Sequence, residues 1–219
     1  MRLRVVEMVN EKIIEAVKKT REAKKRNFKQ SFDLAINLKN IDLKNPENRV
    51  KTEIKLPHGT GKETKIGVFV DSLASQAKNI ENIIVIKKDQ LSFLGKNKKE
   101  AKKIAKGCRY FLAEAPLMPL VGKNLGPVLA PRNLMPLPIP PNANLETMIN
   151  EKRNVLKINL KDSPTIHVGV GTEDMDDQKI AENIDAIIKN VVPKLPKGKQ
   201  QVKNYVIKLT MGKPVKFKL

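Results

Sequence analysis

Two short stretches of the chain, at 31–38 and 210–212, carry small polar side chains or glycine where a partner could approach the main chain closely. From Ser31 to Leu38 the residues alternate in character, as the two faces of a β-strand require. One face would hold Phe32, Leu34, Ile36 and Leu38, and the other Ser31, Asp33, Ala35 and Asn37. The second face is small and polar, without the long charged side chains of an ordinary solvated surface. We expect it to bind RNA, with Thr210-Met211-Gly212 near the C-terminus lying close to it.

The residues needed for catalysis or for a metal site are scarce. His58 and His167 are the only histidines, too few with a single cysteine for a His/Cys metal cluster. The segment GTGK at 59–62 resembles part of a phosphate-binding loop, but Leu56 stands where that loop needs Gly and Glu63 where it needs Ser or Thr. We therefore expect no catalytic residue, no metal and no cofactor. The alternative of a nucleotide- or RNA-processing enzyme lacks a convergent acid, base or nucleophile.

The composition favours a polyanionic partner. Lys and Arg total 43 against 23 Asp and Glu, a formal net charge of +20, which attracts nucleic acids and speeds their encounter. Most of the cations are Lys, which suits phosphates better than base edges. The single cysteine, Cys108, excludes a disulfide framework and fits a reducing compartment. No apolar run approaches the length of a membrane span, so we expect a cytoplasmic protein without a membrane partner.

The two ends of the chain predict elements of one kind, a mixture of helices and amphipathic strands. Before residue 66 we expect a helix from Val5 to about Thr20 and strands at 31–38 and 51–56, the second able to pair with the first. After residue 160 we expect a strand at 165–171, a helix ending near Val191, a strand at 202–209 and a closing strand at 215–219. The acidic residues between 173 and 177 would begin that last helix and point away from RNA. The basic run at 19–26 is either a solvated helix end or a phosphate contact.

The middle of the chain predicts elements of another kind. Apolar runs at 66–70, 83–86 and 110–113 alternate with helical segments at 71–79 and 90–107, a pattern typical of a parallel sheet covered on both faces. The proline-rich segment 115–144 predicts short helices and turns packed by Leu, Val and Met. A last helix at 145–150 and a return strand at 155–160 follow. The lysine-rich helix at 96–106 is either a solvated face or a surface that touches RNA phosphates.

These patterns predict an α+β fold with two domains. Each end of the chain is too small for a robust core of its own, so both ends should combine. Domain I would be an α+β sandwich of residues 1–66 and 159–219, and domain II an inserted three-layer α/β domain of residues 67–158.

Four segments resemble the L1 family of large-subunit ribosomal proteins, and the resemblance covers essentially the whole chain. They are LPHGTGK at 56–62, GKNLGPVLAPRNLMP at 122–136, KLTMGKP at 208–214 and NFKQS at 27–31. The continuation PLPIPPNANLE is more similar to the archaeal and eukaryotic branch than to the bacterial branch.

The resemblance implies a ribonucleoprotein component rather than an enzyme, with a Rossmann-like inserted domain. Its domain I would bind a helical hairpin of large-subunit rRNA and so form the mobile stalk beside the exit site for tRNA. It would assist release of deacylated tRNA, repress translation by binding its own mRNA, and be a monomer away from the ribosome. A non-specific RNA chaperone is a further alternative, because the net charge alone would bind RNA without specificity.

The same resemblance implies a set of RNA-binding residues. They are Phe28, Ser31, Asp33, His167, Gly171, Asn204, Thr210, Met211 and Gly212. Strict alternation conflicts with two of them, because it places Phe28 in phase with Phe32 and Met211 in phase with Leu209. Each of these two side chains therefore faces either the core or the RNA.

Overall fold

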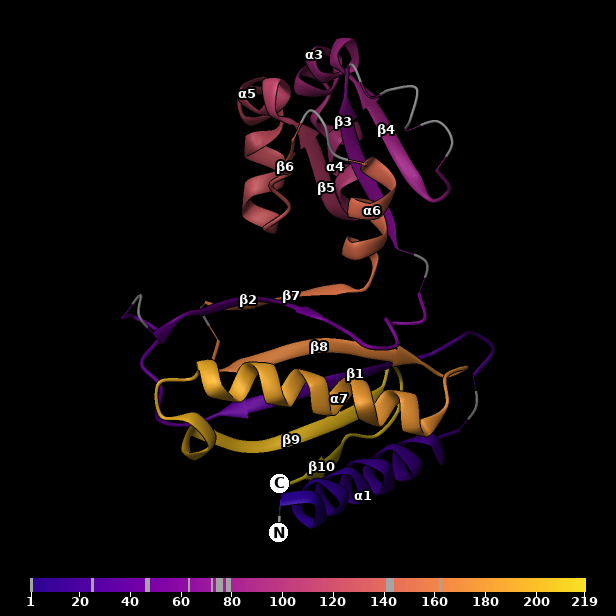
Figure 1. Cartoon of the computed structure of the whole chain (residues 1–219), viewed down its shortest axis with the longest axis vertical. Helices are drawn as coiled ribbons and strands as arrows, with labels where there is room; N and C mark the ends of the chain where they lie inside the picture. Colours follow the sequence, from indigo (N-terminus) through magenta and orange to yellow (C-terminus); the bar gives the residue numbers. More distant parts are fainter. Residues whose placement is uncertain are drawn as a thin grey trace. The chain divides into compact units, whose positions relative to one another are not determined.

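The chain folds into two compact units, each described here by itself (Figure 1). The computed structural model describes residues 2–24, 26–45, 48–62, 64–71, 73, 77, 80–140, 144–161 and 163–219, with the main chain alone for residues 2–10. Unit 1 comprises Met1–Lys62 and Asn154–Leu219, and unit 2 comprises Glu63–Arg153. Both crossings between the units lie a few residues earlier in the chain than the expected bounds. All of β3 (Lys65–Val70) lies in unit 2, and all of β7 (Val155–Leu160) lies in unit 1.

Unit 1 is built around an antiparallel four-stranded sheet in the order β10-β9-β1-β8. The central strand β1 (Ser31–Leu38) pairs with β8 (Thr165–Thr172) on one side and β9 (Val202–Leu209) on the other. The short strand β10 (Val215–Phe217) closes the sheet beyond β9. The sheet therefore joins segments from both ends of the chain, as the sequence predicts.

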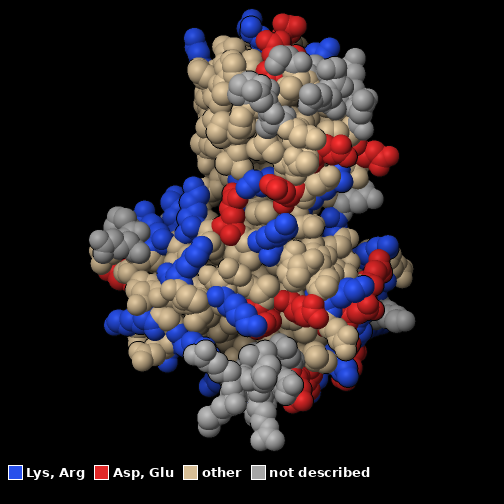
Figure 2. All heavy atoms as spheres, in the orientation of Figure 1, with Lys and Arg blue, Asp and Glu red and all other residues tan. Residues whose placement is uncertain are grey.

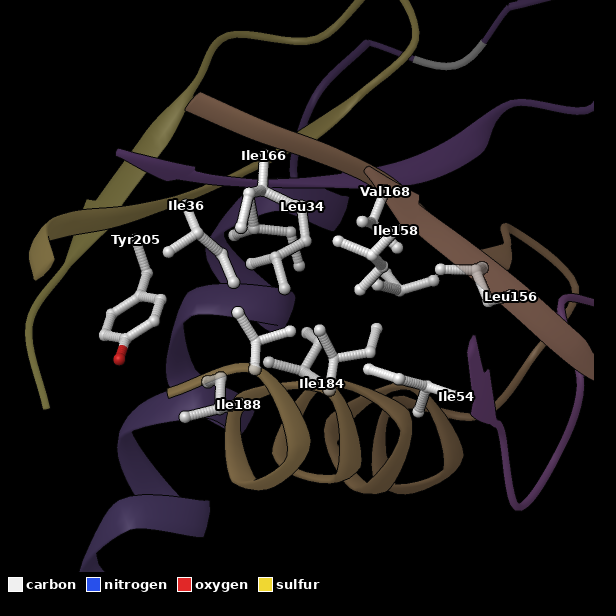
Figure 3. Packing of buried hydrophobic residues seen from close by; sticks show 14 of the residues in the cluster. Leu34, Ile36, Ile54, Leu156, Ile158, Ile166, Val168, Ile184, Ile188 and Tyr205 are labelled. Atoms are coloured by element: carbon white, nitrogen blue, oxygen red, sulfur yellow. The ribbon is translucent and has the colours of Figure 1, made fainter. Parts of the chain in front are cut away.

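Two helices cover one face of this sheet (Figure 1). They are α1 (Arg2–Arg21) and α7 (Asp177–Val191), the second continued by the 3-10 turns η4 (Val192–Lys194) and η5 (Gly198–Gln201). In the core, Leu34 and Ile36 of β1 point towards Ile184 and Ile188 of α7 (Figure 3). Each such apolar side chain stabilises the fold by about 1.5–3 kcal/mol when it is fully buried.

A two-stranded sheet of β2 (Val50–Lys55) and β7 completes the core of unit 1. The expectation that β2 pairs with β1 is wrong, because β2 pairs with β7 in antiparallel register. Alternate residues of β2 are buried, so its apolar face joins the same core, where Ile54 lies near Leu156 and Ile158 (Figure 3). The alternation in the sequence predicted this strand correctly but carries no information about its partner.

The loop at 56–62 that follows β2 is fixed to α7 by the fully buried side chain of Asn183. Asn183 Oδ1 accepts a hydrogen bond from the main-chain N–H of His58 at 3.2 Å, and Nδ2 donates to the carbonyls of Gly59 at 2.8 Å and Val170 at 2.9 Å. Gly59 has a φ of 63° and Gly61 a φ of 65°, conformations that side chains with a Cβ rarely adopt. The GTGK motif thus serves an anchored turn between strands.

Unit 2 contains a parallel four-stranded sheet in the order β4-β3-β5-β6, as expected for the insert. Its strands are β3, β4 (Ile83–Lys87), β5 (Cys108–Glu114) and β6 (Leu137–Ile139). Helices α3 (Lys88–Lys96), α4 (Lys98–Gly107) and α5 (Met118–Leu129) pack on one face, around the stacked rings of Phe69 and Phe111 at 5.6 Å. Helix α6 (Leu145–Arg153) lies in front of the sheet in Figure 1.

Three parts of unit 2 refine the sequence-based predictions. The long helix expected at 90–107 is two helices, which meet at Asn97. The proline-rich segment includes the 12-residue helix α5, which tolerates Pro119 in its first turn and Pro127 in its last, between the 3-10 turns η2 (Ala115–Leu117) and η3 (Ala130–Arg132). Pro138 lies in the edge strand β6, where a missing N–H is tolerated. Most of the helix expected at 71–79 lies outside the described residues.

Candidate nucleic-acid interface

The face of the β10-β9-β1-β8 sheet opposite the helices carries the polar residues that the sequence singled out. We call it the polar face; across β8, β1 and β9 it consists of Thr165, His167, Gly169, Asp33, Ala35, Asn37, Asn204, Val206 and Lys208. Asp33 pairs in register with Gly169 on one side and Lys208 on the other, and Ala35 pairs with His167 and Val206. His167 is exposed and Asp33 half-buried. The structure therefore brings Asp33 and His167 onto one surface.

A row of three polar side chains crosses the far end of the polar face. Asn37 Nδ2 donates a hydrogen bond to Asn204 Oδ1 at 2.7 Å, and Thr165 Oγ1 donates to Asn37 Oδ1 at 3.2 Å. Cross-strand pairs of this kind stabilise a sheet. Asn204, a predicted site residue, is thus held in a fixed orientation by Asn37.

Gly171 lies on the other face of the sheet. The register between β1 and β8 shifts between Phe32 and Asp33, so that Phe32 pairs with Gly171 and Asp33 with Gly169. Gly171 is buried, and a Cβ placed on it would lie 3.2 Å from Ile180 Cγ1 of α7. Close packing between sheet and helix therefore explains this glycine without a ligand, and only its main chain could take part in binding.

At the end of the sheet where β1 begins, the turn after β9 is fixed to Ser31. The main-chain N–H of Ser31 donates to Thr210 Oγ1 at 3.1 Å, and the N–H of Thr210 donates to the Ser31 carbonyl at 3.1 Å. Gly212 N–H closes the turn on the Leu209 carbonyl at 3.0 Å. A Cβ on Gly212 would lie 3.0 Å from Leu209 Cβ, so the tight turn itself favours glycine there.

Met211 and Phe28 both lie outside the core. β9 ends at Leu209 and β1 begins at Ser31, so strict alternation does not extend to either residue. Met211 is 61% exposed and Phe28 50% exposed. Neither side chain therefore packs in the core, and both are accessible to solvent.

Gln30 connects the turn after β9 to the segment before α7, and the sequence analysis did not single it out as a site residue. It is 1% exposed; its Oε1 accepts from the Met211 N–H at 3.2 Å, and its carbonyl accepts from the Glu173 N–H at 3.0 Å. Gln30 Nε2 is buried without a hydrogen-bond partner among the described residues. A signal was present in the sequence, because a polar residue in phase with Phe32 indicates a hydrogen-bonded side chain on the inner face.

The acidic residues at the start of α7 lie beside this corner, contrary to the expectation that they would point away from the interface. The Gln30 N–H donates to Glu173 Oε2 at 3.3 Å, and Lys29 Nζ forms an ion pair with Asp174 at 2.8 Å. A surface hollow of about 640 Å³ opens between the acidic and basic side chains. It is lined by Arg21, Arg26, Asn27, Phe28, Lys29, Glu173 and Asp174. The acidic residues lie here because β8 runs antiparallel to β1. The end of β8, which leads into α7, therefore lies where β1 begins.

The basic run at 19–26 was expected to be either a solvated helix end or a phosphate contact, and Arg21 is neither. Its guanidinium donates to Asp177 Oδ1 at 2.8 Å and to the carbonyls of Glu173 and Met175 at 2.7 Å, and lies 5.5 Å from the centroid of the Phe32 ring. Arg21 is therefore a structural link between α1 and the start of α7. Lys24 and Arg26, by contrast, are exposed.

The architecture defines a basic α+β protein with an inserted parallel α/β unit and a polar sheet face. Among the described residues there is no group of three His, Cys, Asp or Glu side chains able to hold a metal ion. None of the described helices combines the length and apolar composition of a membrane span.

Comparison with known proteins gives the family. The model of the ribosomal protein L1p/L10e family matches residues 17–213. Large ribosomal subunit protein uL1 of Methanothermobacter thermautotrophicus is 49% identical over 210 residues, covering 95% of this chain and 99% of that protein. The uL1 proteins of Methanothermococcus thermolithotrophicus (51% identity over 212 residues; 96% and 99% of the two chains) and Thermococcus kodakarensis (46% over 208; 94% and 96%) are also similar. The chain belongs to the ribosomal protein L1p/L10e family.

Family membership confirms several of the sequence-based predictions. The chain is a ribosomal protein of the archaeal type, a structural protein rather than an enzyme. The same membership confirms the predicted cytoplasmic location at the ribosome.

Proposed function

We propose that the chain, as a component of the large ribosomal subunit, binds a hairpin of the subunit's rRNA through the polar face of unit 1 and the adjoining turn at Thr210-Met211-Gly212. The observation that carries the proposal is the exposure of Met211 and Phe28 beside the hydrogen-bonded pair of Ser31 and Thr210. Met211 offers an apolar contact and Phe28 the flat face of its ring to sugars or bases, while the polar groups beside them are held in fixed positions.

The chemistry of the polar face suits the shallow groove of an RNA helix. Its central residues are short, so a ribose-phosphate backbone can come close without displacing long side chains. Asp33 would accept a hydrogen bond from a ribose 2′-hydroxyl, and His167 would donate one.

The acidic side chains beside this corner set a limit on the path of the RNA. Glu173 and Asp174 would repel phosphates, so the backbone would pass over Met211 and the polar face rather than into the hollow around Phe28. Phe28 would then contact the edge of the RNA.

The family resemblance extends the proposal beyond rRNA. Bound to its hairpin, the protein would form the mobile stalk beside the tRNA exit site and assist release of deacylated tRNA. A similar structure in its own mRNA would bind the same residues and repress translation. The protein would be a monomer away from the ribosome.

The test compares two exposed methionines. Footprinting on intact large-subunit rRNA first locates the hairpin. Met211→Ala should then weaken binding of that hairpin by about tenfold or more, roughly 1.4 kcal/mol, at fixed salt. Met135→Ala in unit 2 removes a methionine that is 40% exposed and should bind within about twofold of wild type. Wild-type affinity of Met211→Ala would contradict the proposed site.

Competition with bulk tRNA at moderate salt separates specific binding from the activity of an RNA chaperone. Non-specific complexes should dissociate as salt rises, because they depend on counterion release, whereas the hairpin complex should persist.

A further inference from the structure

Helix α4 in unit 2 presents a one-sided basic surface. Its sequence, KKEAKKIAKG, carries lysines at 98, 99, 102, 103 and 106, all of them exposed. Ala101 and Ala105 form the buried side of the helix. Residues four apart share a helix face, so Lys98, Lys102 and Lys106 form one row and Lys99 and Lys103 a second row beside it.

These lysines lack ion pairs of the kind that three exposed lysines make on the helix-covered side of unit 1. On α1, Lys19 pairs with Glu15 at 2.7 Å; on α7, Lys189 pairs with Asp185 at 2.5 Å, and Lys179 pairs with Asp176 just before that helix at 3.2 Å. Basic and acidic side chains accordingly intermingle over α7 (Figure 2). None of the α4 lysines forms an ion pair with a described residue.

An unpaired lysine row costs the isolated protein stability. Like charges four residues apart on a helix repel each other and destabilise the helix. A solvated face would reduce this repulsion by alternating charges, but Glu100 is the only acidic residue of α4. A polyanion laid along the rows would remove the repulsion.

Arg132 adds another cation to the same surface. It belongs to η3, which follows α5, and its Nη1 donates to the carbonyl of Lys102 at 3.3 Å. This hydrogen bond places an exposed guanidinium beside the middle of the lysine rows. The basic surface is therefore built from two segments of unit 2.

We propose that α4 and Arg132 form a second RNA-contact surface, which binds the phosphate backbone of an RNA helix without reading its sequence. Lysine is a point charge suited to phosphates, and α4 holds no aromatic, hydroxyl or amide side chain that could read a base edge. An RNA duplex carries closely spaced phosphates along both strands, so each lysine can reach a phosphate in many registers. RNA is favoured over an acidic polypeptide because the chain is a ribosomal protein.

The experiment compares two triple variants of the full chain with the same loss of charge. One is Lys98→Gln/Lys102→Gln/Lys106→Gln on α4. The control, Lys19→Gln/Lys179→Gln/Lys189→Gln, removes exposed lysines that are ion-paired on the helix-covered side of unit 1. Binding to a mixed-sequence RNA duplex is titrated at several salt concentrations, and thermal melts establish that both variants fold.

The α4 variant should bind the duplex about tenfold or more weakly at low salt, and its slope of log K against log salt should fall by about 2. The control should stay within about twofold of wild type. Equal weakening of both variants would show that only the net charge matters. Unchanged binding of the α4 variant would show that the α4 lysines face solvent and do not contact RNA. Either result overturns the proposal. Displacement of the duplex by polyglutamate at equal charge would overturn it in favour of an acidic polypeptide.

This surface is independent of the site proposed in unit 1, and the two can fail separately. Met211→Ala should bind the generic duplex as wild type does, while the α4 variant should retain its preference for the rRNA hairpin over other RNA. A failure of the α4 variant to differ from its control leaves the result for Met211→Ala intact.

Discussion

Ser31 and Thr210 hold each other through their main chains and through one hydroxyl group. The Ser31 N–H donates to Thr210 Oγ1 and the Thr210 N–H donates to the Ser31 carbonyl, each at 3.1 Å. The first residue of β1 is thereby fixed to the residue that follows β9. Any partner that contacts Met211 would depend on this pair, because it sets the direction in which the turn leaves the sheet.

Thr210→Ala should therefore weaken binding of the rRNA hairpin by about 10- to 100-fold, roughly 1.4–3 kcal/mol. The hydroxyl accepts from the Ser31 N–H at 3.1 Å and donates to the Ser31 carbonyl at 3.4 Å, so its loss should cost the fold about 1–2 kcal/mol. Thr210→Ser keeps the hydroxyl and should retain most of the affinity. The measurement is the dissociation constant of the three proteins at one salt concentration; an Ala variant indistinguishable from the Ser variant would exclude a role for the hydroxyl.

Arg21 should be more important to the stability of unit 1 than its place in a basic run indicates. Arg21→Lys should destabilise unit 1 by about 2–4 kcal/mol, because lysine cannot reproduce the fork that reaches Asp177 and the carbonyls of Glu173 and Met175. The exposed Lys18 on the same helix provides the control, and Lys18→Ala should change stability by less than about 0.5 kcal/mol. Urea unfolding measures both; similar values for the two variants would contradict the assignment.

The strands were predictable where their two faces differ in chemistry. In β1 and β9, buried apolar residues alternate with polar or less buried ones, and the predicted bounds match the observed ones. The partner of β2 was not predictable, because alternation specifies which face is buried and not which strand lies beside it. The inward position of Gly171 depends on a register shift opposite Phe32, which no local pattern reveals.

The candidate site was predictable as a set of residues but not as a geometry. Phe28 and Met211 became accessible because the strands end at Ser31 and Leu209, a boundary that alternation alone does not define. The roles of Gln30 and Arg21 depend on hydrogen bonds to segments more than 140 residues away along the chain. Such long-range partners follow from the order of the strands in the sheet. Local patterns in a single sequence do not reveal that order.

Replacing single glycines of unit 2 by alanine should change its stability in different directions, depending on the space around each glycine. A Cβ on Gly122 of α5 would meet nothing within 4 Å, so Gly122→Ala should stabilise unit 2 by about 0.5–1 kcal/mol. Gly126→Ala should not give this gain, because Pro127 disfavours a helical residue with a Cβ before it. Gly67→Ala should destabilise, since its Cβ would lie 2.3 Å from the ring of Phe111. Thermal melts of the three variants should give this order, and stabilisation by Gly67→Ala would contradict the packing of β3 on β5.

Cys108 provides a prediction about pH, since burial raises the pKa of its thiol to about 11. At pH 8 only about one thiol in a thousand would be ionised, so native Cys108 should react slowly with iodoacetamide and rapidly once unfolded. Because the folded pKa lies above the unfolded value near 9.0, the stabilising contribution is present below about pH 9 and is lost as the pH rises through 11. Cys108→Ala should therefore reduce the loss of stability between those pH values, as measured by urea unfolding. Equal pH dependence in the two proteins, or rapid labelling of the native chain at its only cysteine, would show that the thiol is not held in the core.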